Sequence, residues 1–228
     1  MTRIKCCRAG LVLAASLFLG CGPPTDELSE IDSAVTGSFT LDFESDALGP
    51  LSSAWTTVKD SSSSPSSASI INTADHGHVL QVHGSPAVPN YLVAAFHFTN
   101  STTHIENSFD INPASGASFV WSFLGSGQAR WIRLQRGPGS QILEAYTAPS
   151  GGTNCGILAS DAWSNVTLVM HADQLPHTFD VLINGAATAC TGLSTSLTAP
   201  YTGVSMLDAS NAGWGGNVML DNIVVGAP

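Results

Sequence analysis

Short runs of β-forming residues follow one another from residue 38 to residue 225 and argue against a helical fold. The runs are rich in Val, Ile, Phe, Trp and Thr, and Gly, Ser, Asn or Pro separate them. Such spacing is typical of an all-β sandwich or barrel. The expected strands are 38–44, 54–59, 68–72, 78–84, 91–98, 105–111, 118–124, 129–136, 141–147, 164–172, 177–185, 186–190, 201–207 and 217–225.

Apolar residues alternate with polar ones in several runs, which gives each strand a core face and an outer face. The clearest apolar sets are Leu92/Ala94/Phe96/Phe98, Val166/Leu168/Met170 and Phe179/Val181/Ile183. Asn184-Gly185 predicts a tight type I′ hairpin between 177–183 and 186–190. About fourteen short strands favour a two-sheet antiparallel jelly-roll sandwich over an up-and-down barrel or a seven-stranded immunoglobulin domain.

The N-terminal segment predicts export. Its first eight residues carry Arg3, Lys5 and Arg8 and no acid, and the apolar run 9–20 follows. A basic start followed by about 7–15 apolar residues is typical of a secretory signal peptide. A transmembrane helix needs about 20 apolar residues, so we expect residues 1–20 to be a signal peptide.

The end of this apolar run resembles a lipobox, in which a small residue precedes a cysteine that becomes lipidated. The sequence Leu17-Phe18-Leu19-Gly20-Cys21 matches it, although Phe18 replaces an aliphatic residue. The resemblance implies a lipoprotein anchored through Cys21, with residues 21–37 as a flexible tether. We expect an outer-membrane or cell-surface location. The alternative is an ordinary signal peptide with an incidental cysteine.

Without residues 1–20 the chain is strongly acidic. The remaining sequence contains four Lys and Arg residues and 17 Asp and Glu residues, which gives a net charge of −13. Nucleic-acid binders carry a basic surface, so nucleic acid is not an expected partner. Anionic lipid surfaces are disfavoured for the same reason, which leaves the lipid anchor as the only expected membrane contact.

Cys155 and Cys190 are the two cysteines that remain beyond the lipobox. In an oxidising compartment they predict one disulfide. A metal pair or a catalytic thiol is the alternative, but there is no CxxC motif and no histidine close in sequence to either cysteine. Residues 38–228 are expected to form one domain, because sandwiches commonly reach this length.

Two motifs mark the ends of the folded region. The first strand contains Leu41-Asp42-Phe43-Glu44, followed by Gly49 and Trp55, and the last contains Val218-Met219-Leu220-Asp221-Asn222-Ile223. Both motifs resemble the end strands of concanavalin A-like and carbohydrate-binding-module jelly rolls. The segments 109–125 and 163–185 resemble laminin-G-like sandwiches. These resemblances imply the fold more than a function, because one fold hosts many functions.

The same resemblance implies a structural Ca²⁺. In such jelly rolls the Glu of the first strand and the Asp of the last often hold calcium, and here these positions are Glu44 and Asp221, with Asp42 as a further candidate. Calcium takes six to eight oxygen ligands, which carboxylates and backbone carbonyls supply. The alternative is that these acids cap strand ends and face water.

Strand 130–136 is the main candidate for ligand binding. Alternation places Trp131, Arg133 and Gln135 on one face, a set suited to stacking on a sugar and bonding its hydroxyl groups. The outer-face residues Tyr91, His97, His171 and Asp180, and the loop residue Trp214, are further candidates. The alternative is that Trp131 covers an edge of the sandwich and that the arginines pair with acids.

Evidence for catalysis is weaker. The E-x-D-x-x-E run of jelly-roll hydrolases is absent, and Glu106 and Asp110 are the nearest pair of acids on one strand face. Polysaccharide lyases of similar fold use Arg, Gln, His and Tyr; Arg133, Gln135, His97, His171 and Tyr146 supply these types without the known motifs. Next to Asp75 there is an H-x-H pair, His76 and His78. Such a pair more often lies in a turn than binds a metal. No catalytic residue is therefore assigned.

Three functions follow in order of preference. The first is a non-catalytic lipoprotein that binds a polysaccharide or other glycan. The second is an envelope scaffold or adhesion module with a protein partner. The third is a polysaccharide lyase or glycoside hydrolase.

Overall fold

The computed structural model describes residues 39–226, except 53–55, 61–65, 86–89, 126–130, 148–150, 198 and 209–214. Within the described strands, the side chains at 56–60, 90–94, 97–99, 131 and 202–208 are also left undescribed. The signal peptide 1–20, the lipid site Cys21 and the tether 21–37 lie outside the described residues. No helix in the described part is long and apolar enough to cross a membrane.

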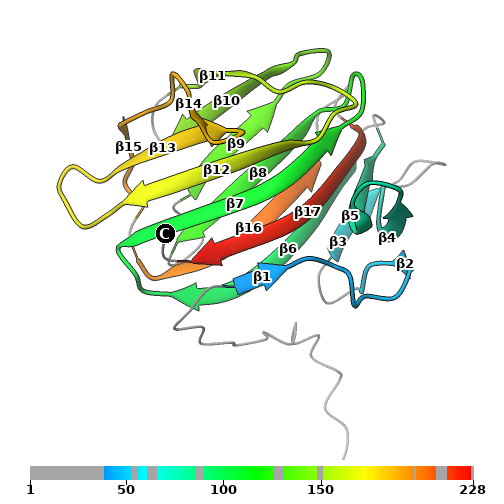
Figure 1. Ribbon diagram of the computed structural model, residues 1–228. Coiled ribbons are helices and arrows are strands. Elements are labelled where there is room, and N and C mark those ends of the chain that lie inside the picture. Colours follow the sequence, from blue (N-terminus) through cyan, green and yellow to red (C-terminus); the bar gives the residue numbers. More distant parts are fainter. Residues whose placement is uncertain are drawn as a thin grey trace, which may run out of the picture. The chain divides into compact units, whose positions relative to one another are not determined.

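Within the described residues, ten strands form sheet A (Figure 1). The order β14-β13-β12-β7-β17-β5-β4-β2 runs across it, with β1 paired to β17 and β15 to β13, and every pair is antiparallel. The strands are β1 (Phe39–Leu41), β2 (Gly49–Pro50), β4 (Ser67–Thr73), β5 (Gly77–Gly84), β7 (His104–Pro113), β12 (Ser164–His171), β13 (Thr178–Ile183), β14 (Ala186–Ala187), β15 (Leu193–Ser194) and β17 (Gly216–Gly226).

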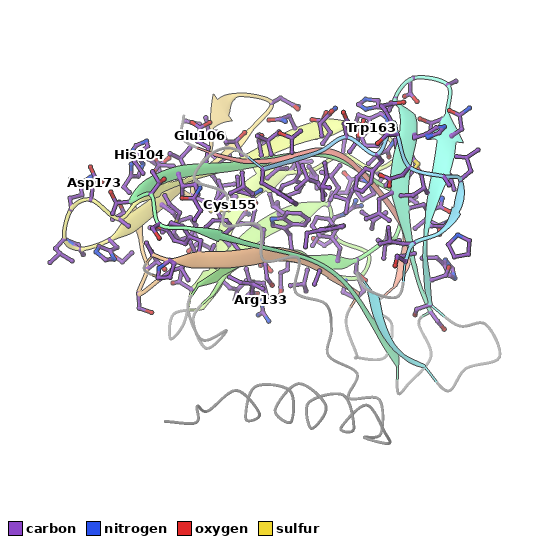
Figure 2. All side chains as sticks on the ribbon, turned by 90° about the horizontal axis from the view of Figure 1, so that it is seen from below. His104, Glu106, Arg133, Cys155, Trp163 and Asp173 are labelled. Atoms are coloured by element: carbon purple, nitrogen blue, oxygen red, sulfur yellow. A yellow bond between two sulfur atoms is a disulfide. The ribbon has the colours of Figure 1, made fainter. Side chains whose placement is uncertain are left out.

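Sheet B has seven strands in the described part, in the order β11-β10-β9-β8-β16-β6-β3, and is also antiparallel. Its strands are β3 (Thr56–Asp60), β6 (Asn90–Asn100), β8 (Phe119–Gly125), β9 (Trp131–Arg136), β10 (Ile142–Thr147), β11 (Thr153–Ile157) and β16 (Tyr201–Asp208). Figure 2 shows the two sheets as stacked layers with side chains between them. The expected all-β, two-sheet antiparallel jelly-roll sandwich is therefore confirmed.

The core lies between the sheets and follows the predicted alternation. Val166, Leu168 and Met170 on β12 are at most 1% exposed, and Phe179 and Val181 on β13 are fully buried. The predicted hairpin is also confirmed, because Ile183 pairs with Ala186 while Asn184 and Gly185 both have positive φ angles of 52° and 73°. A type I′ turn requires such angles at both central residues.

Several strands differ from the sequence-based expectation. The first strand ends at Leu41 instead of residue 44, because Phe43 takes a φ of 56° and its carbonyl accepts a turn hydrogen bond from Asp46. Strand 186–190 is limited to β14, residues 186–187. Strand β11 was not predicted, because Asn154 and Gly156 have low intrinsic preference for strands.

The predicted disulfide is present and joins the two layers at one side of the sandwich. Cys155 lies in β11, the edge strand of sheet B, and Cys190 follows β14, the edge strand of sheet A. Both residues are buried, at 3% and 0% exposure. The disulfide therefore links the two sheets covalently at this edge of the sandwich.

Candidate functional site

A polar cluster on the outer face of sheet B is the candidate site. Ile132 and Leu134 of β9 are fully buried, so the alternate residues Arg133 and Gln135 face outward. In β10, Leu143 and Ala145 are buried and the alternate residues Glu144 and Tyr146 face outward. Figure 2 shows Arg133 pointing away from the sandwich, as the sequence predicted.

Strand register brings the four outward side chains together. Arg133 pairs with Tyr146, and Gln135 pairs with Glu144. The Arg133 guanidinium lies 4.6 Å from the centre of the Tyr146 ring, a distance suited to a cation–π contact. Gln135 Nε2 and the Tyr146 hydroxyl both donate to Glu144 Oε2, at 3.3 and 2.9 Å. The sheet-B cluster, Arg133, Gln135, Glu144 and Tyr146, thus combines donors, acceptors and an aromatic ring.

The environment of Tyr146 makes it a donor. Burial raises the pKa of Tyr146, and its hydrogen bond and charge interaction with Glu144 raise it further, while Arg133 acts in the opposite direction. The phenol is therefore protonated at neutral pH. Gly152 leaves room for the ring, because a Cβ atom there would lie 2.4 Å from Tyr146 Cζ.

The other predicted ligand-binding residues are only partly brought to this face. The backbones of Trp131 and His97 lie in one row across sheet B. Leu124 and Gly203 lie between them in this row, because Trp131 pairs with Leu124, Leu124 with Gly203, and Gly203 with His97. Tyr91 pairs with Lys59 at the far side of the same sheet. The side chains of Trp131, His97 and Tyr91 lie outside the described residues, as does all of Trp214.

His171 does not join the sheet-B cluster. It lies on β12 of sheet A, where its Nε2 atom is 3.1 Å from Asp180 Oδ2. The alternation along β12 and along β13 correctly predicted that His171 and Asp180, respectively, avoid the core. Alternation alone could not indicate which sheet contains the strand.

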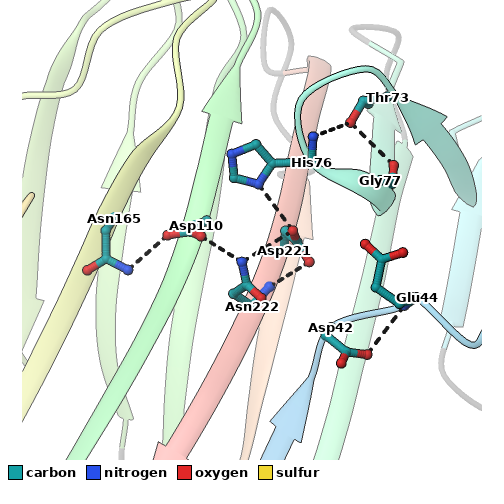
Figure 3. Close-up of polar contacts among 9 residues, drawn as sticks. All are labelled: Asp42, Glu44, Thr73, His76, Gly77, Asp110, Asn165, Asp221 and Asn222. Carbon is teal, nitrogen blue, oxygen red and sulfur yellow. Dashed lines mark hydrogen bonds and ion pairs between the residues drawn. The ribbon is translucent and has the colours of Figure 1, made fainter.

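A second polar network lies on sheet A around Asp221 (Figure 3). Asp221 is 4% exposed, and its Oδ2 atom lies 3.1 Å from His76 Nδ1. The side-chain amide of Asn222 donates to Asp221 and to Asp110, at 3.3 and 2.9 Å. Burial raises the pKa of Asp221, while hydrogen bonds from His76 and from the Asn222 backbone lower it.

Two of the residues proposed for calcium, Glu44 and Asp221, each lie against the turn between β4 and β5. Asp221 contacts His76, and the Glu44 carboxylate lies so close to Gly77 that a Cβ atom there would be 2.2 Å from Glu44 Oε1. Asp42 Oδ1 accepts a hydrogen bond from the Glu44 backbone at 3.3 Å. The Glu44 and Asp221 carboxylates thus flank one short turn, and carboxylates with nearby backbone carbonyls fit the ligand preferences of calcium.

The calcium site nevertheless stays a prediction. Among the residues that the structure describes, no group of three or more His, Cys, Asp or Glu side chains is arranged to hold a metal ion. Backbone carbonyls would therefore have to complete the ligand set around Glu44 and Asp221.

Calcium is expected to raise the thermal unfolding temperature of the domain, because a ligand that binds only the folded state stabilises it, by about 2.7 kcal/mol at 100 times its Kd. The substitution Glu44→Gln should remove this calcium-dependent shift. The matched control Asp46→Asn changes an exposed acid whose backbone carbonyl, not its side chain, contacts His78. A full shift retained by Glu44→Gln in differential scanning fluorimetry would rule out Glu44 as a ligand.

No protein-family model and no curated protein matches the sequence, so the comparisons rest on solved structures. A sialidase matches with a TM-score of 0.61 and 13% identity over 84% of this chain, which spans only 18% of the sialidase. An endo-β-1,4-glucuronan lyase from the fungus Trichoderma reesei matches with a TM-score of 0.53 and 14% identity, covering 85% of this chain and 96% of the lyase.

An endo-1,3-β-glucanase from Streptomyces sioyaensis matches over 92% of this chain and 100% of its own length, with a TM-score of 0.50 and 11% identity. The domain has the concanavalin A-like jelly-roll fold. At these identities the likeness establishes the fold alone, and the fold agrees with the resemblance in the first and last strands.

Proposed function

We propose that this domain binds a glycan, without catalysis, through the sheet-B cluster. The observation that carries the proposal is the convergence of Arg133, Gln135, Glu144 and Tyr146 on one outer face. Sugar hydroxyls both donate and accept hydrogen bonds, and this cluster offers the guanidinium and amide as donors and the carboxylate as an acceptor. Trp131 in the same strand would add a stacking surface.

Binding is favoured over catalysis by the chemistry of the cluster. The glucuronan lyase and the glucanase are enzymes, so the fold itself permits glycan chemistry. In this chain the raised pKa of Tyr146 favours a protonated donor over a base. Glu144 is the one carboxylate in the cluster and already accepts two hydrogen bonds, whereas glycoside hydrolysis uses a pair of carboxylates.

A glycan array tests this function. All described strands lie between residues 39 and 226 and share one core, so a soluble form of residues 38–228 retains the domain. The array is run with Ca²⁺ and again with EDTA. Binding that weakens in Trp131→Ala supports the proposal, and loss of binding in EDTA supports the calcium site. Absence of binding to any glycan in both conditions contradicts glycan recognition.

A protein partner is the second candidate, and one observation favours it. Ile142 and Ile157 pair across β10 and β11 and are 38% and 69% exposed. Exposed apolar side chains at a sheet edge suit protein contacts. If the glycan array is negative, the soluble domain is cross-linked in envelope extracts and compared with the double variant Ile142→Ser/Ile157→Ser. A cross-linked partner that is lost in the double variant indicates binding at this edge, and absence of any cross-linked partner contradicts it.

We also propose that Cys21 anchors the protein through a lipid to the outer membrane or the cell surface. Attachment of more than one acyl chain at Cys21 would anchor the protein stably, because each buried CH₂ contributes about 0.8 kcal/mol. Metabolic labelling with an alkyne fatty acid is expected to mark the natural chain and the control Cys7→Ala, but not Cys21→Ala. Equal labelling of Cys21→Ala would contradict the anchor.

A further inference from the structure

Two histidines that are far apart in the sequence lie side by side on the outer face of sheet A. His104 of β7 and His171 of β12 are directly opposite in the strand register. Their rings meet edge to face, with centroids 5.0 Å apart. Directly opposed residues on antiparallel strands have Cβ atoms about 4.5–5.5 Å apart, which lets two imidazoles reach one ion.

Asp180 of β13 holds the second imidazole. Its Oδ2 atom lies 3.1 Å from His171 Nε2, and its Oδ1 atom accepts a hydrogen bond from the Gly192 backbone at 2.6 Å. A histidine that binds a metal commonly donates its other ring N–H to a carboxylate, which fixes the ring and its tautomer. The contact with Asp180 would therefore leave Nδ1 of His171 as the ligand atom.

The electrostatic surroundings favour a cation. Glu106 lies two residues from His104 on the same face of β7, and both are half-buried. Asp180 is 28% exposed, and His171 is 22% exposed, so water can reach the pair. The described strands of sheet A contain no Lys or Arg that would compete with a cation.

We propose that His104 and His171 bind a divalent transition-metal ion, with Asp180 as the carboxylate that orients His171. Imidazole nitrogen is a ligand preferred by Zn²⁺, Cu²⁺ and Ni²⁺, at about 2.0–2.1 Å for zinc. Two protein ligands leave the remaining positions to water or to an incoming group.

The H-x-H pair seen in the sequence is not this site. His76 Nδ1 faces Asp221, and the His76 ring stacks on Trp163 with centroids 3.9 Å apart. His78 Nδ1 instead lies 3.1 Å from the backbone carbonyl of Asp46. The two rings are thus engaged with different partners, whereas strand pairing brings His104 and His171 together.

Zinc titration by isothermal calorimetry tests the proposal. The soluble form of residues 38–228 is used with excess Ca²⁺, which occupies any oxygen-ligand site. One Zn²⁺ per chain is expected. His104→Ala and His171→Ala should each weaken the affinity by about tenfold or more, and Asp180→Asn by about 10–100-fold. His83→Ala, which removes a histidine bound to Asn217 elsewhere on sheet A, should leave the affinity unchanged.

A spectroscopic measurement separates loss of a ligand from loss of the fold. Electron paramagnetic resonance of bound Cu²⁺ should show hyperfine coupling to two imidazole nitrogens in the natural chain and in His83→Ala, and to one in His104→Ala and in His171→Ala. Thermal unfolding of the variants without metal checks their folding. Absence of zinc binding, or unchanged affinity in both His104→Ala and His171→Ala, would overturn the proposal.

Discussion

Replacing Trp121 with alanine is expected to lower the free energy of unfolding by about 3–5 kcal/mol, the usual loss when a buried aromatic side chain is deleted. Trp121 is fully buried on β8 of sheet B, and its ring stacks on Phe109 of sheet A with centroids 4.2 Å apart. Its indole Nε1 donates to Asn107 Oδ1 at 2.8 Å. The side chain therefore joins the two sheets by packing and by a buried hydrogen bond.

The loss of that hydrogen bond lowers the free energy of unfolding further, beyond the effect of the cavity. Asn107 is fully buried, and its amide also donates to the Val224 carbonyl at 3.1 Å. A buried acceptor without a donor costs about 1–3 kcal/mol. The matched control is Leu124→Ala, on the same strand but half-buried on the outer face. Urea unfolding followed by fluorescence and circular dichroism should show a far larger loss for Trp121→Ala, and equal losses would contradict this account of the core.

Removing the disulfide is expected to have the second largest effect on stability. The bond between Cys155 and Cys190 closes a loop with a sequence separation of 35 residues. On the chain-entropy account, a loop of this length restricts the unfolded chain by about 3–4 kcal/mol. The double variant Cys155→Ala/Cys190→Ala should therefore lower the free energy of unfolding by about this amount, as measured by urea unfolding.

Reduction provides the control for this prediction. A thiol reductant should destabilise the natural chain by a similar amount and leave the double variant unchanged. Because the bond joins the edge strand β11 to the segment that follows β14, backbone hydrogen exchange should increase most in β10 and β11 when it is absent. A double variant as stable as the oxidised natural chain would show that the bond does not contribute to stability.

Local patterns were sufficient for the sandwich and for its clearest hairpin. The alternation in 164–171 and 178–183 depends on residues that are close in sequence, and Asn184-Gly185 specifies its own turn. Strand β11 had no such signal. It forms because it pairs with β10 and is fixed by Cys155, and both interactions depend on tertiary structure.

For the sheet-B cluster, the sequence predicted which side chains share a face of one strand, but not which strands lie next to each other. Period-two alternation placed Arg133 and Gln135 together, and the structure confirms this. Glu144 and Tyr146 join them through the pairing of β9 with β10, which the turn at Gly137-Pro138-Gly139 could have suggested. The stacking of His76 on Trp163 and the pairing of His104 with His171 join residues that only the fold brings together.

The most direct test of the central claim is the dissociation constant of the glycan found on the array, measured for two variants on opposite outer faces. Arg133→Ala alters the sheet-B cluster, and His83→Ala alters sheet A. A hydrogen bond to a charged group contributes about 1.5–3 kcal/mol, so Arg133→Ala should weaken binding by about tenfold or more while His83→Ala leaves it unchanged. Unchanged affinity in Arg133→Ala, or equal losses in both variants, would contradict glycan binding on this face of sheet B.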